Sequence, residues 1–282
     1  MICAWQLLLG LLPVWMRDIV DKHGRSGLLE LRMRVSMPPI LRMNDRNIVL
    51  DRTVSIDDLK FCINMVTRYS PWSVSTASKC YYTAPGGHRI GLCGNVTVSG
   101  GQVIGVGELS SLCIRIARDF EGIAKGLIHL NGSVLILGRP GCGKTTLLRD
   151  YIRQLSYKEG ESVTVVDERK EIFPFSNGKF CFNPGMYADV ISGCAKSVGI
   201  EAALRNTGPT VIAVDEITAA EDCNSLMHAG WCGVKLIATA HAGSREDLFS
   251  RPVYKPLVDS GLFEHLIIMH PDKSWHLEEM KQ

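Results

Sequence analysis

The chain lacks three features that would narrow its function at once: a paired cysteine motif, a strong net charge and an apolar run long enough to cross a membrane. None of its ten cysteines forms a Cys-x-x-Cys pair, which argues against a zinc site. Their scatter among apolar runs instead predicts buried, reduced thiols. The formal net charge is +2, and no basic stripe with interleaved aromatic residues is present, so we expect no nucleic-acid partner.

The N-terminal stretch "MICAWQLLLGLLPVWM" is apolar enough to imitate a signal peptide or a membrane anchor. No Lys or Arg precedes its apolar run, it has no small-residue cleavage site, and it is shorter than the about 20 residues that cross a bilayer. It therefore predicts a buried or partner-facing helix and no membrane span. A peripheral membrane contact stays open, because large apolar side chains of such a helix would also face outward.

The first part of the chain predicts a small α+β domain over residues 1–122. Short extended runs and one helical pattern follow one another over residues 28–117, and period-two alternation places Leu31 and Met33 on one strand face. The stretch "SGGQ" at 99–102 resembles a signature of ABC transporter ATPases. It lies between "GNVTV" and "VIGV", where a glycine-rich hairpin turn explains it better.

The stretch "ILGRPGCGKTTLLRD" joins a strand-like run to a helix-like run through a glycine-rich loop. Gly138, four further residues, Gly143, Lys144 and Thr145 fit the template G-x-x-x-x-G-K-[ST] at every defined position. Glycines let backbone N–H groups point at phosphate oxygens, Lys144 supplies a charge for the β- and γ-phosphates, and Thr145 offers a hydroxyl to Mg²⁺. The predicted cofactor-binding residues are Gly138, Arg139, Pro140, Gly141, Cys142, Gly143, Lys144, Thr145 and Thr146.

Residues 123–282 predict a doubly wound α/β domain. Apolar runs without alternation, such as "SVTVVD", "TVIAVDE" and "VKLIATAHA", are separated by segments with helical spacing. This pattern is typical of parallel strands that are buried on both faces.

Two carboxylates follow the buried run "TVIAV", at the sheet edge where ligands gather in such folds. Asp215 is placed to hold Mg²⁺ together with Thr145, and Glu216 to orient or deprotonate an attacking water. A kinase would also hold Mg²⁺, but a Glu directly after the Asp favours water as the acceptor.

Polar residues also follow two other strand-like runs. "VTVVDERKEI" places Asp167, Glu168 and Glu171 beyond one strand, and "LIATAHAGS" places Thr239 and His241 beyond another. His241 could contact a γ-phosphate or the attacking water, or it could be a structural histidine, and the residues alone leave both interpretations open.

The order of these motifs resembles the secretion-type motor ATPases of type II and type IV systems, and within them the stage III AA family of endospore-forming bacteria. In the second half the resemblance rests on "GRPGCGKTTLLRD", "VVDERKEI", "GIEAALRN", "VIAVDEI" and "IATAHA". In the first half it rests on "LELRMRVSMPP", "GGHRIGLCGNVTV" and "SSLCIRIARD". The resemblance implies a RecA-like P-loop ATPase domain with a mainly parallel sheet, and catalytic roles for Lys144, Glu168, Glu216 and His241.

The resemblance further implies ATP and Mg²⁺ as cofactors, a homo-oligomer, normally a hexameric ring, and membrane proteins of a sporulation channel as partners. The expected protein is a cytoplasmic motor that reaches the membrane through those partners on the mother-cell side and couples ATP hydrolysis to assembly or transport. The alternative is a nucleotide-binding assembly scaffold with little turnover.

One departure from the family pattern concerns arginine. Family members carry an Arg-rich segment before the "VIAVDEI" motif, whereas "NPGMYADVISG" contains no arginine. Arg115, Arg118 and Arg205 are therefore the candidates for an arginine finger, each with an ordinary surface charge as the alternative.

Overall fold

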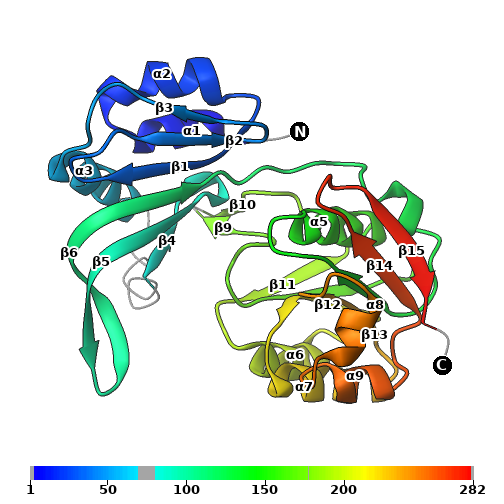
Figure 1. Ribbon diagram of the computed structural model, residues 1–282. Helices are drawn as coiled ribbons and strands as arrows, with labels where there is room; N and C mark the ends of the chain where they lie inside the picture. The colour runs from blue at the N-terminus through cyan, green and yellow to red at the C-terminus, as the bar shows by residue number, and fades with distance from the viewer. Residues whose placement is uncertain (1–2, 69–79, 177, 281–282) are drawn as a thin grey trace. The chain divides into compact units, whose positions relative to one another are not determined.

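The computed structural model describes residues 3–68, 80–176 and 178–280 (Figure 1). The chain divides into two compact units, Met1–Asp119 with Pro174–Cys181, and Phe120–Phe173 with Phe182–Gln282. The division at Asp119 lies three residues before the predicted boundary at 122. In the segment 174–181, which groups with the first unit, the described residues form two short strands, β9 (Phe175–Ser176) and β10 (Lys179–Phe180). Strands of two residues leave no periodic signal in a sequence.

The first unit is built on an antiparallel sheet with the strand order β3-β2-β1-β6-β5-β4. Its strands are β1 (Leu28–Arg34), β2 (Ile40–Met43), β3 (Asn47–Val49), β4 (Tyr81–Thr83), β5 (Arg89–Ser99) and β6 (Gln102–Arg115). β5 and β6 form the long hairpin in Figure 1, and they are joined through Gly100 and Gly101, whose φ angles are 57° and 77°. Positive φ at two successive residues suits a tight hairpin turn, so the prediction of a turn at "SGGQ" is confirmed.

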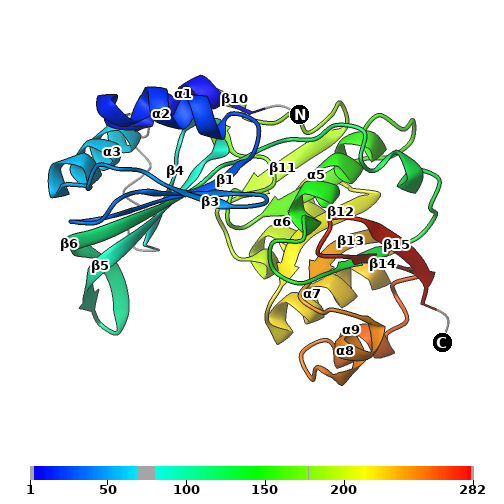
Figure 2. The same cartoon turned by 45° about the horizontal axis from the view of Figure 1, so that its top comes forward.

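Three helices cover one side of this sheet (Figure 2): α1 (Trp5–Leu11), α2 (Val14–Gly24) and α3 (Ile56–Arg68). The apolar N-terminal run forms two helices rather than one, because Pro13 precedes α2 as its N-cap. Leu8 and Met16 from this run are fully buried, together with Leu31 and Met33 of β1 as predicted. Every helix in the described part of the chain is too short or too polar to span a bilayer.

His88 is a fully buried histidine that links three parts of the first unit. Its Nδ1 accepts a hydrogen bond from the backbone N–H of Ala117 at 3.2 Å, and its Nε2 lies 3.2 Å from the carbonyl oxygen of Ala4. Because Nδ1 accepts, the ring proton lies on Nε2 and is donated to Ala4. Burial lowers the pKa of His88 to about 4.

We expect the first unit to become less stable as the pH falls from 6.5 to about 4. The folded pKa lies below the ordinary value, so the unfolded chain takes up the proton first and stability is complete only above pH 6.5. The loss in free energy of unfolding should be on the order of 3 kcal/mol. His88→Gln keeps a donor and an acceptor without titrating, so urea unfolding of this variant should show a weaker pH dependence. An unchanged pH dependence would contradict the assignment.

The second unit contains a sheet with the strand order β11-β8-β12-β13-β7-β14-β15, in which only β15 runs antiparallel to its neighbour. Its strands are β7 (Val134–Leu137), β8 (Val163–Asp167), β11 (Ala188–Ser192), β12 (Val211–Ile217), β13 (Lys235–Ala240), β14 (His265–Met269) and β15 (Trp275–Glu279). This is the predicted doubly wound domain with a mainly parallel sheet, which is confirmed.

Helices cover both faces of this sheet. In Figure 1, α5 (Lys144–Leu155) lies on one side, and α6 (Lys196–Asn206), α7 (Ala220–Trp231) and α9 (Lys255–Asp259) lie on the other, with α8 (Arg245–Ser250) next to α9. Coverage on both faces explains why the strands are continuous apolar runs: all four residues of β7 are buried.

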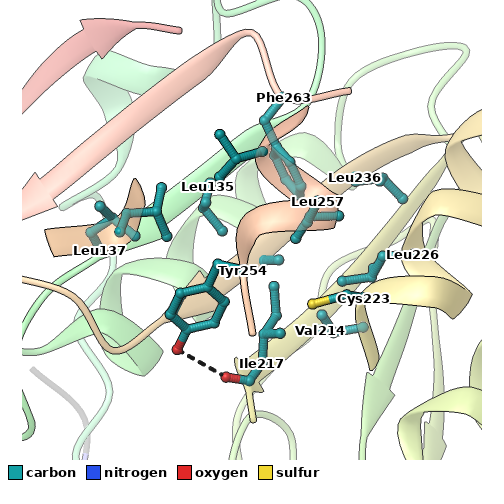
Figure 3. Packing of buried hydrophobic residues seen from close by; sticks show 14 of the residues in the cluster. Leu135, Leu137, Val214, Ile217, Cys223, Leu226, Leu236, Tyr254, Leu257 and Phe263 are labelled. Carbon is teal, nitrogen blue, oxygen red and sulfur yellow. Dashed lines mark hydrogen bonds between the residues drawn. The ribbon is translucent and has the colours of Figure 1, made fainter. Parts of the chain in front are cut away.

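The core beneath α7 and α9 also fixes the carboxyl ends of two strands (Figure 3). Tyr254 is buried among leucines, and its hydroxyl donates a hydrogen bond to the carbonyl oxygen of Ile217, the last residue of β12, at 3.2 Å. The same hydroxyl accepts the backbone N–H of His241, just after β13, at 3.3 Å. One core residue thus ties together the two chain segments that carry Glu216 and His241.

The ten cysteines are all free thiols. Cys62, Cys142 and Cys223 are buried, as predicted, but Cys93 and Cys232 are exposed, so the prediction of burial was wrong for these two. Cys93 lies on the long β5–β6 hairpin and Cys232 directly follows α7, so the apolar residue before each of them in the sequence does not indicate burial.

Candidate active site

The glycine-rich loop joins β7 to α5, as its motif predicts. Gly143, the N-cap of α5, has a φ of 102°, which favours glycine. At Gly138 a Cβ atom would lie 2.4 Å from the Cys142 sulfur and 2.9 Å from the Met269 Cβ, so no other residue fits. The loop therefore places backbone N–H groups and the positive end of a 12-residue helix at one point, which is the arrangement that binds phosphate.

Within the loop, Cys142 is buried, whereas Arg139, Pro140 and Gly141 are exposed. The predicted cofactor-binding residues thus divide into an exposed rim and an inner side chain that packs under the loop. Thr146 is half-buried in the first turn of α5.

The side chain of Lys144 is only 6% exposed and turns back into the loop. Its ammonium group donates to the carbonyl oxygens of Gly138 at 2.8 Å and Arg139 at 3.2 Å, and it lies 3.0 Å from Nδ1 of His241. Burial lowers the pKa of Lys144, while the nearby carboxylates of Asp215 and Glu216 act in the opposite direction. The Lys144 ammonium, which is predicted to bind phosphate, is therefore held at the loop by two carbonyl oxygens and His241. Phosphate oxygens of a nucleotide can replace these partners.

Thr145 and Asp215, the two predicted metal ligands, are in direct contact. The Thr145 hydroxyl donates to Oδ2 of Asp215 at 2.6 Å. A hydroxyl and a carboxylate side by side are the hard oxygen donors that Mg²⁺ prefers, so this pair fits the predicted metal.

A local irregularity at the end of β12 brings both acidic residues to the sheet edge. The pairing of β12 with β13 shifts register between Val214 and Ile217, and Glu216 has a φ of 55°. Such a conformation in a non-glycine residue is strained and persists only where neighbours hold it. Thr239 of β13 supplies one restraint, because its hydroxyl accepts the Glu216 N–H at 2.8 Å and donates to Oδ1 of Asp215 at 2.5 Å.

His241 lies between Lys144 and Glu216. Its Nε2 is 2.5 Å from Oε1 of Glu216, and its Nδ1 faces the Lys144 ammonium. Because an ammonium group can only donate, Nδ1 is the acceptor and Nε2 carries the proton. Burial raises the pKa of Glu216, but the hydrogen bond from His241 and the charge of Arg169 outweigh this effect and lower it.

The turn after β8 carries the predicted acidic cluster. Asp167 is buried and accepts three backbone N–H groups, from Glu171, Ile172 and Phe173, at 2.8 to 2.9 Å. Burial raises the pKa of Asp167 to about 6, and these hydrogen bonds oppose the rise. Glu168 is paired with the buried Lys196 at 2.7 Å.

A small cavity of about 10 Å³ lies among the side chains of these acidic residues. This volume is close to the minimum that holds one water molecule. Its lining residues are Asp167, Glu168, Arg169, Glu171, Lys196, Asp215 and Glu216. The structure thus brings Glu168 and Glu171 to the same cavity as the metal and base candidates.

Three side chains of this site were given no role by sequence reasoning: Arg169, Lys196 and Tyr254. Arg169 bonds Glu216, Lys196 bonds Glu168, and Tyr254 anchors the backbone beneath them. Arg169 stands within the acidic motif "VVDERKEI", next to Lys170, so a basic pair among the acidic residues is the signal that marks it. The other two lie far along the chain from the residues they contact, and no local pattern marks them.

The arginines proposed from the sequence have partners of their own within their units. Arg118 donates to backbone carbonyls of Gly24, Arg25 and Leu28, so it has a structural role in the first unit. Arg115 is 67% exposed and lies 3.8 Å from Glu30. Arg205 is 75% exposed on α6 and pairs with Glu201 at 2.6 Å.

Thr239→Val should destabilise the second unit by about 1–3 kcal/mol, because it leaves the Glu216 N–H without its acceptor and removes the donor to Oδ1 of Asp215. Thr239→Ser keeps the hydroxyl and is the matched control. Urea unfolding measures both variants. If the valine variant is as stable as the serine variant, Thr239 does not restrain the two acids.

Comparison with known proteins shows the family of this chain. A family model described as "Sporulation stage III, protein AA" matches residues 6–276. The stage III sporulation protein AA of Bacillus subtilis (strain 168) is 35% identical over 269 residues, which cover 91% of this chain and 88% of that protein.

Two solved structures share the fold. The Legionella pneumophila ATPase DotB is 18% identical and aligns with a TM-score of 0.61, over 94% of this chain and 79% of its own. The pilus retraction motor PilT, with bound ADP, is 15% identical and aligns with a TM-score of 0.61, over 89% of this chain and 76% of its own. The chain therefore belongs to the sporulation stage III protein AA family and has the RecA-like fold that it shares with DotB and PilT.

Proposed function

We propose that this chain is a Mg²⁺-dependent ATPase. The observation that carries the proposal is the convergence of Lys144, Thr145, Asp215, Glu216 and His241 in one connected set of hydrogen bonds at the carboxyl edge of the sheet. Ligands bind at this edge in doubly wound folds. A phosphate loop, a pair of hard oxygen ligands and a carboxylate beside them are the groups that hydrolysis of a nucleoside triphosphate needs.

Each group has a distinct task in this proposal. The loop amides and Lys144 bind the β- and γ-phosphates, and Thr145 with Asp215 holds Mg²⁺, which neutralises charge on the phosphates when bound. Glu216 accepts the proton of the attacking water, and His241 fixes the orientation of the Glu216 carboxylate through the 2.5 Å contact. Glu168 lines the neighbouring cavity, and the ammonium group of Lys196 neutralises the charge of its carboxylate.

Membership of the sporulation family and the fold shared with DotB and PilT support a motor role. In this proposal the chain forms a homo-oligomeric ring of six copies. The ring couples ATP hydrolysis to assembly or transport by a secretion-like channel during endospore formation. The proposed ring lies on the cytoplasmic, mother-cell side of the membrane and contacts the membrane through the channel proteins.

A nucleotide-binding scaffold with little turnover is the second candidate, and one observation favours it. The Lys144 ammonium is bonded to two loop carbonyls and His241, and both oxygens of Glu216 are engaged, so the groups needed for hydrolysis are satisfied by one another. Such a network has to be rearranged before it can act on a nucleotide.

Steady-state phosphate release, measured with Mg²⁺ at several protein concentrations alongside particle size, separates the two candidates. The motor proposal predicts ATP turnover that rises per chain as ring-sized particles form, and that stops when EDTA removes Mg²⁺. Binding of ATP without phosphate release at every concentration, with assembly confirmed by light scattering, would favour the scaffold.

A further inference from the structure

Arg169 is held close to the reactive groups by a firmly fixed turn. The turn begins at Asp167, the last residue of β8, and folds back so that the Asp167 carboxylate accepts the N–H groups of residues 171–173. Lys170 within it has a φ of 57°, which reverses the chain direction. Arg169 is therefore presented at the sheet edge by a buried anchor rather than by a free loop.

The guanidinium of Arg169 donates to Oε2 of Glu216, while His241 holds the other carboxylate oxygen. The Arg169 side chain is 43% exposed, so it can rotate toward solvent and change partners. Lys196, the other cation at the same cavity, is 4% exposed and bound to both Glu168 and Asp222. Lys196 is thus committed to a buried ion-pair cluster, and Arg169 is the cation at this cavity that can meet an incoming anion.

We propose that Arg169 recognises the terminal phosphate of the bound nucleoside triphosphate and supplies, from the same chain, the guanidinium that the reaction requires. The proposal rests on the proposed ATPase function. A guanidinium paired with a carboxylate exchanges readily for a phosphate, because both anions accept its planar, two-pronged set of N–H donors. Charge builds up on the terminal phosphate oxygens during hydrolysis, where such a cation acts most strongly.

The exchange also frees one oxygen of the Glu216 carboxylate. In the structure Arg169 holds Oε2 and His241 holds Oε1. When Arg169 turns to phosphate, Oε2 is left to accept a hydrogen bond from the attacking water.

Nucleotide binding tests the proposal without relying on turnover. We expect Arg169→Ala to weaken binding of the β,γ-imido analogue of ATP by about tenfold or more in the presence of Mg²⁺, and to change ADP binding by less than about twofold. Phosphate release from ATP should fall about tenfold or more in the same variant. Arg169→Lys keeps the charge without the two-pronged geometry. Its triphosphate affinity and its rate of phosphate release should lie between those of the wild type and of Arg169→Ala.

Arg251→Ala is the matched control, because Arg251 is 44% exposed and pairs with the Asp247 carboxylate on α8. It should leave both affinities and phosphate release unchanged. Equal weakening of triphosphate and ADP in Arg169→Ala, or no weakening of either, overturns the proposal, as does faster hydrolysis, which would make Arg169 a restraint on Glu216.

The wild-type chain separates this inference from the proposed function. If it binds the triphosphate more tightly than ADP through Arg169 but releases no phosphate, the recognition role stands and the ATPase activity fails. If it hydrolyses ATP at a rate that Arg169→Ala does not change, the activity stands and the role of Arg169 fails.

Discussion

Lys144→Ala removes tight ATP binding from a chain that still folds. The ammonium group is the buried cation of the loop, and it lies 2.8 Å from the Gly138 carbonyl oxygen at the point where the phosphates are proposed to bind. Arg139, the other cation of the loop, is exposed at its rim, so loss of Lys144 should weaken ATP binding by about 10²-fold or more. Isothermal titration with ATP and Mg²⁺ measures the affinity, and circular dichroism checks the fold.

Lys235→Ala is a suitable control for this experiment. Lys235 opens β13 at the amino edge of the parallel sheet, opposite the proposed site, and it is paired with Glu161 at 2.7 Å. Removing this charge should leave ATP affinity unchanged. A folded Lys144→Ala chain that binds ATP as tightly as the wild type would mean that the loop does not hold the phosphates.

Glu216→Gln retains ATP and Mg²⁺ but hydrolyses ATP at least about 10²-fold more slowly, the usual scale for loss of a general base. The amide preserves the size of the side chain and its carbonyl oxygen can still accept from His241 or Arg169. It cannot accept a proton from water at neutral pH. Binding and phosphate release should therefore be separated in this variant.

Glu161→Gln provides the comparison, since Glu161 is an ion-paired carboxylate at the opposite edge of the sheet. Its phosphate release should match the wild type. If Glu216→Gln hydrolyses ATP at the wild-type rate, another group activates the water, and Glu168 at the same cavity becomes the next carboxylate to replace.

The parts of the structure that could be predicted are those that short stretches of sequence specify by themselves. The phosphate loop needs glycine at positions where φ is positive or where a Cβ would collide, so Gly138 and Gly143 mark it directly. The apolar run of β12 ends in Asp215 and Glu216, which the parallel sheet carries to its ligand-binding edge. Gly100 and Gly101 mark the β5–β6 turn in the same way, because both have a positive φ angle.

The parts that could not be predicted depend on contacts between distant segments. Tyr254 holds Ile217 and His241 from 37 and 13 residues away, and Lys196 meets Glu168 over a separation of 28 residues. The left-handed conformation of Glu216 is imposed by the register shift against β13 and has no signature in its neighbours. Arg169 was not among the arginine candidates chosen by position in the sequence, because only the folded sheet edge brings it to Glu216.

Hydrolysis at this sheet edge is tested most directly by phosphate release after Mg²⁺ is added to assembled protein that has been loaded with ATP in EDTA. We expect the wild-type chain to begin releasing phosphate on addition of Mg²⁺, and Glu216→Gln to keep its ATP intact under the same conditions. Wild-type protein that holds ATP with Mg²⁺ and releases no phosphate would contradict the claim that this sheet edge is a hydrolytic site.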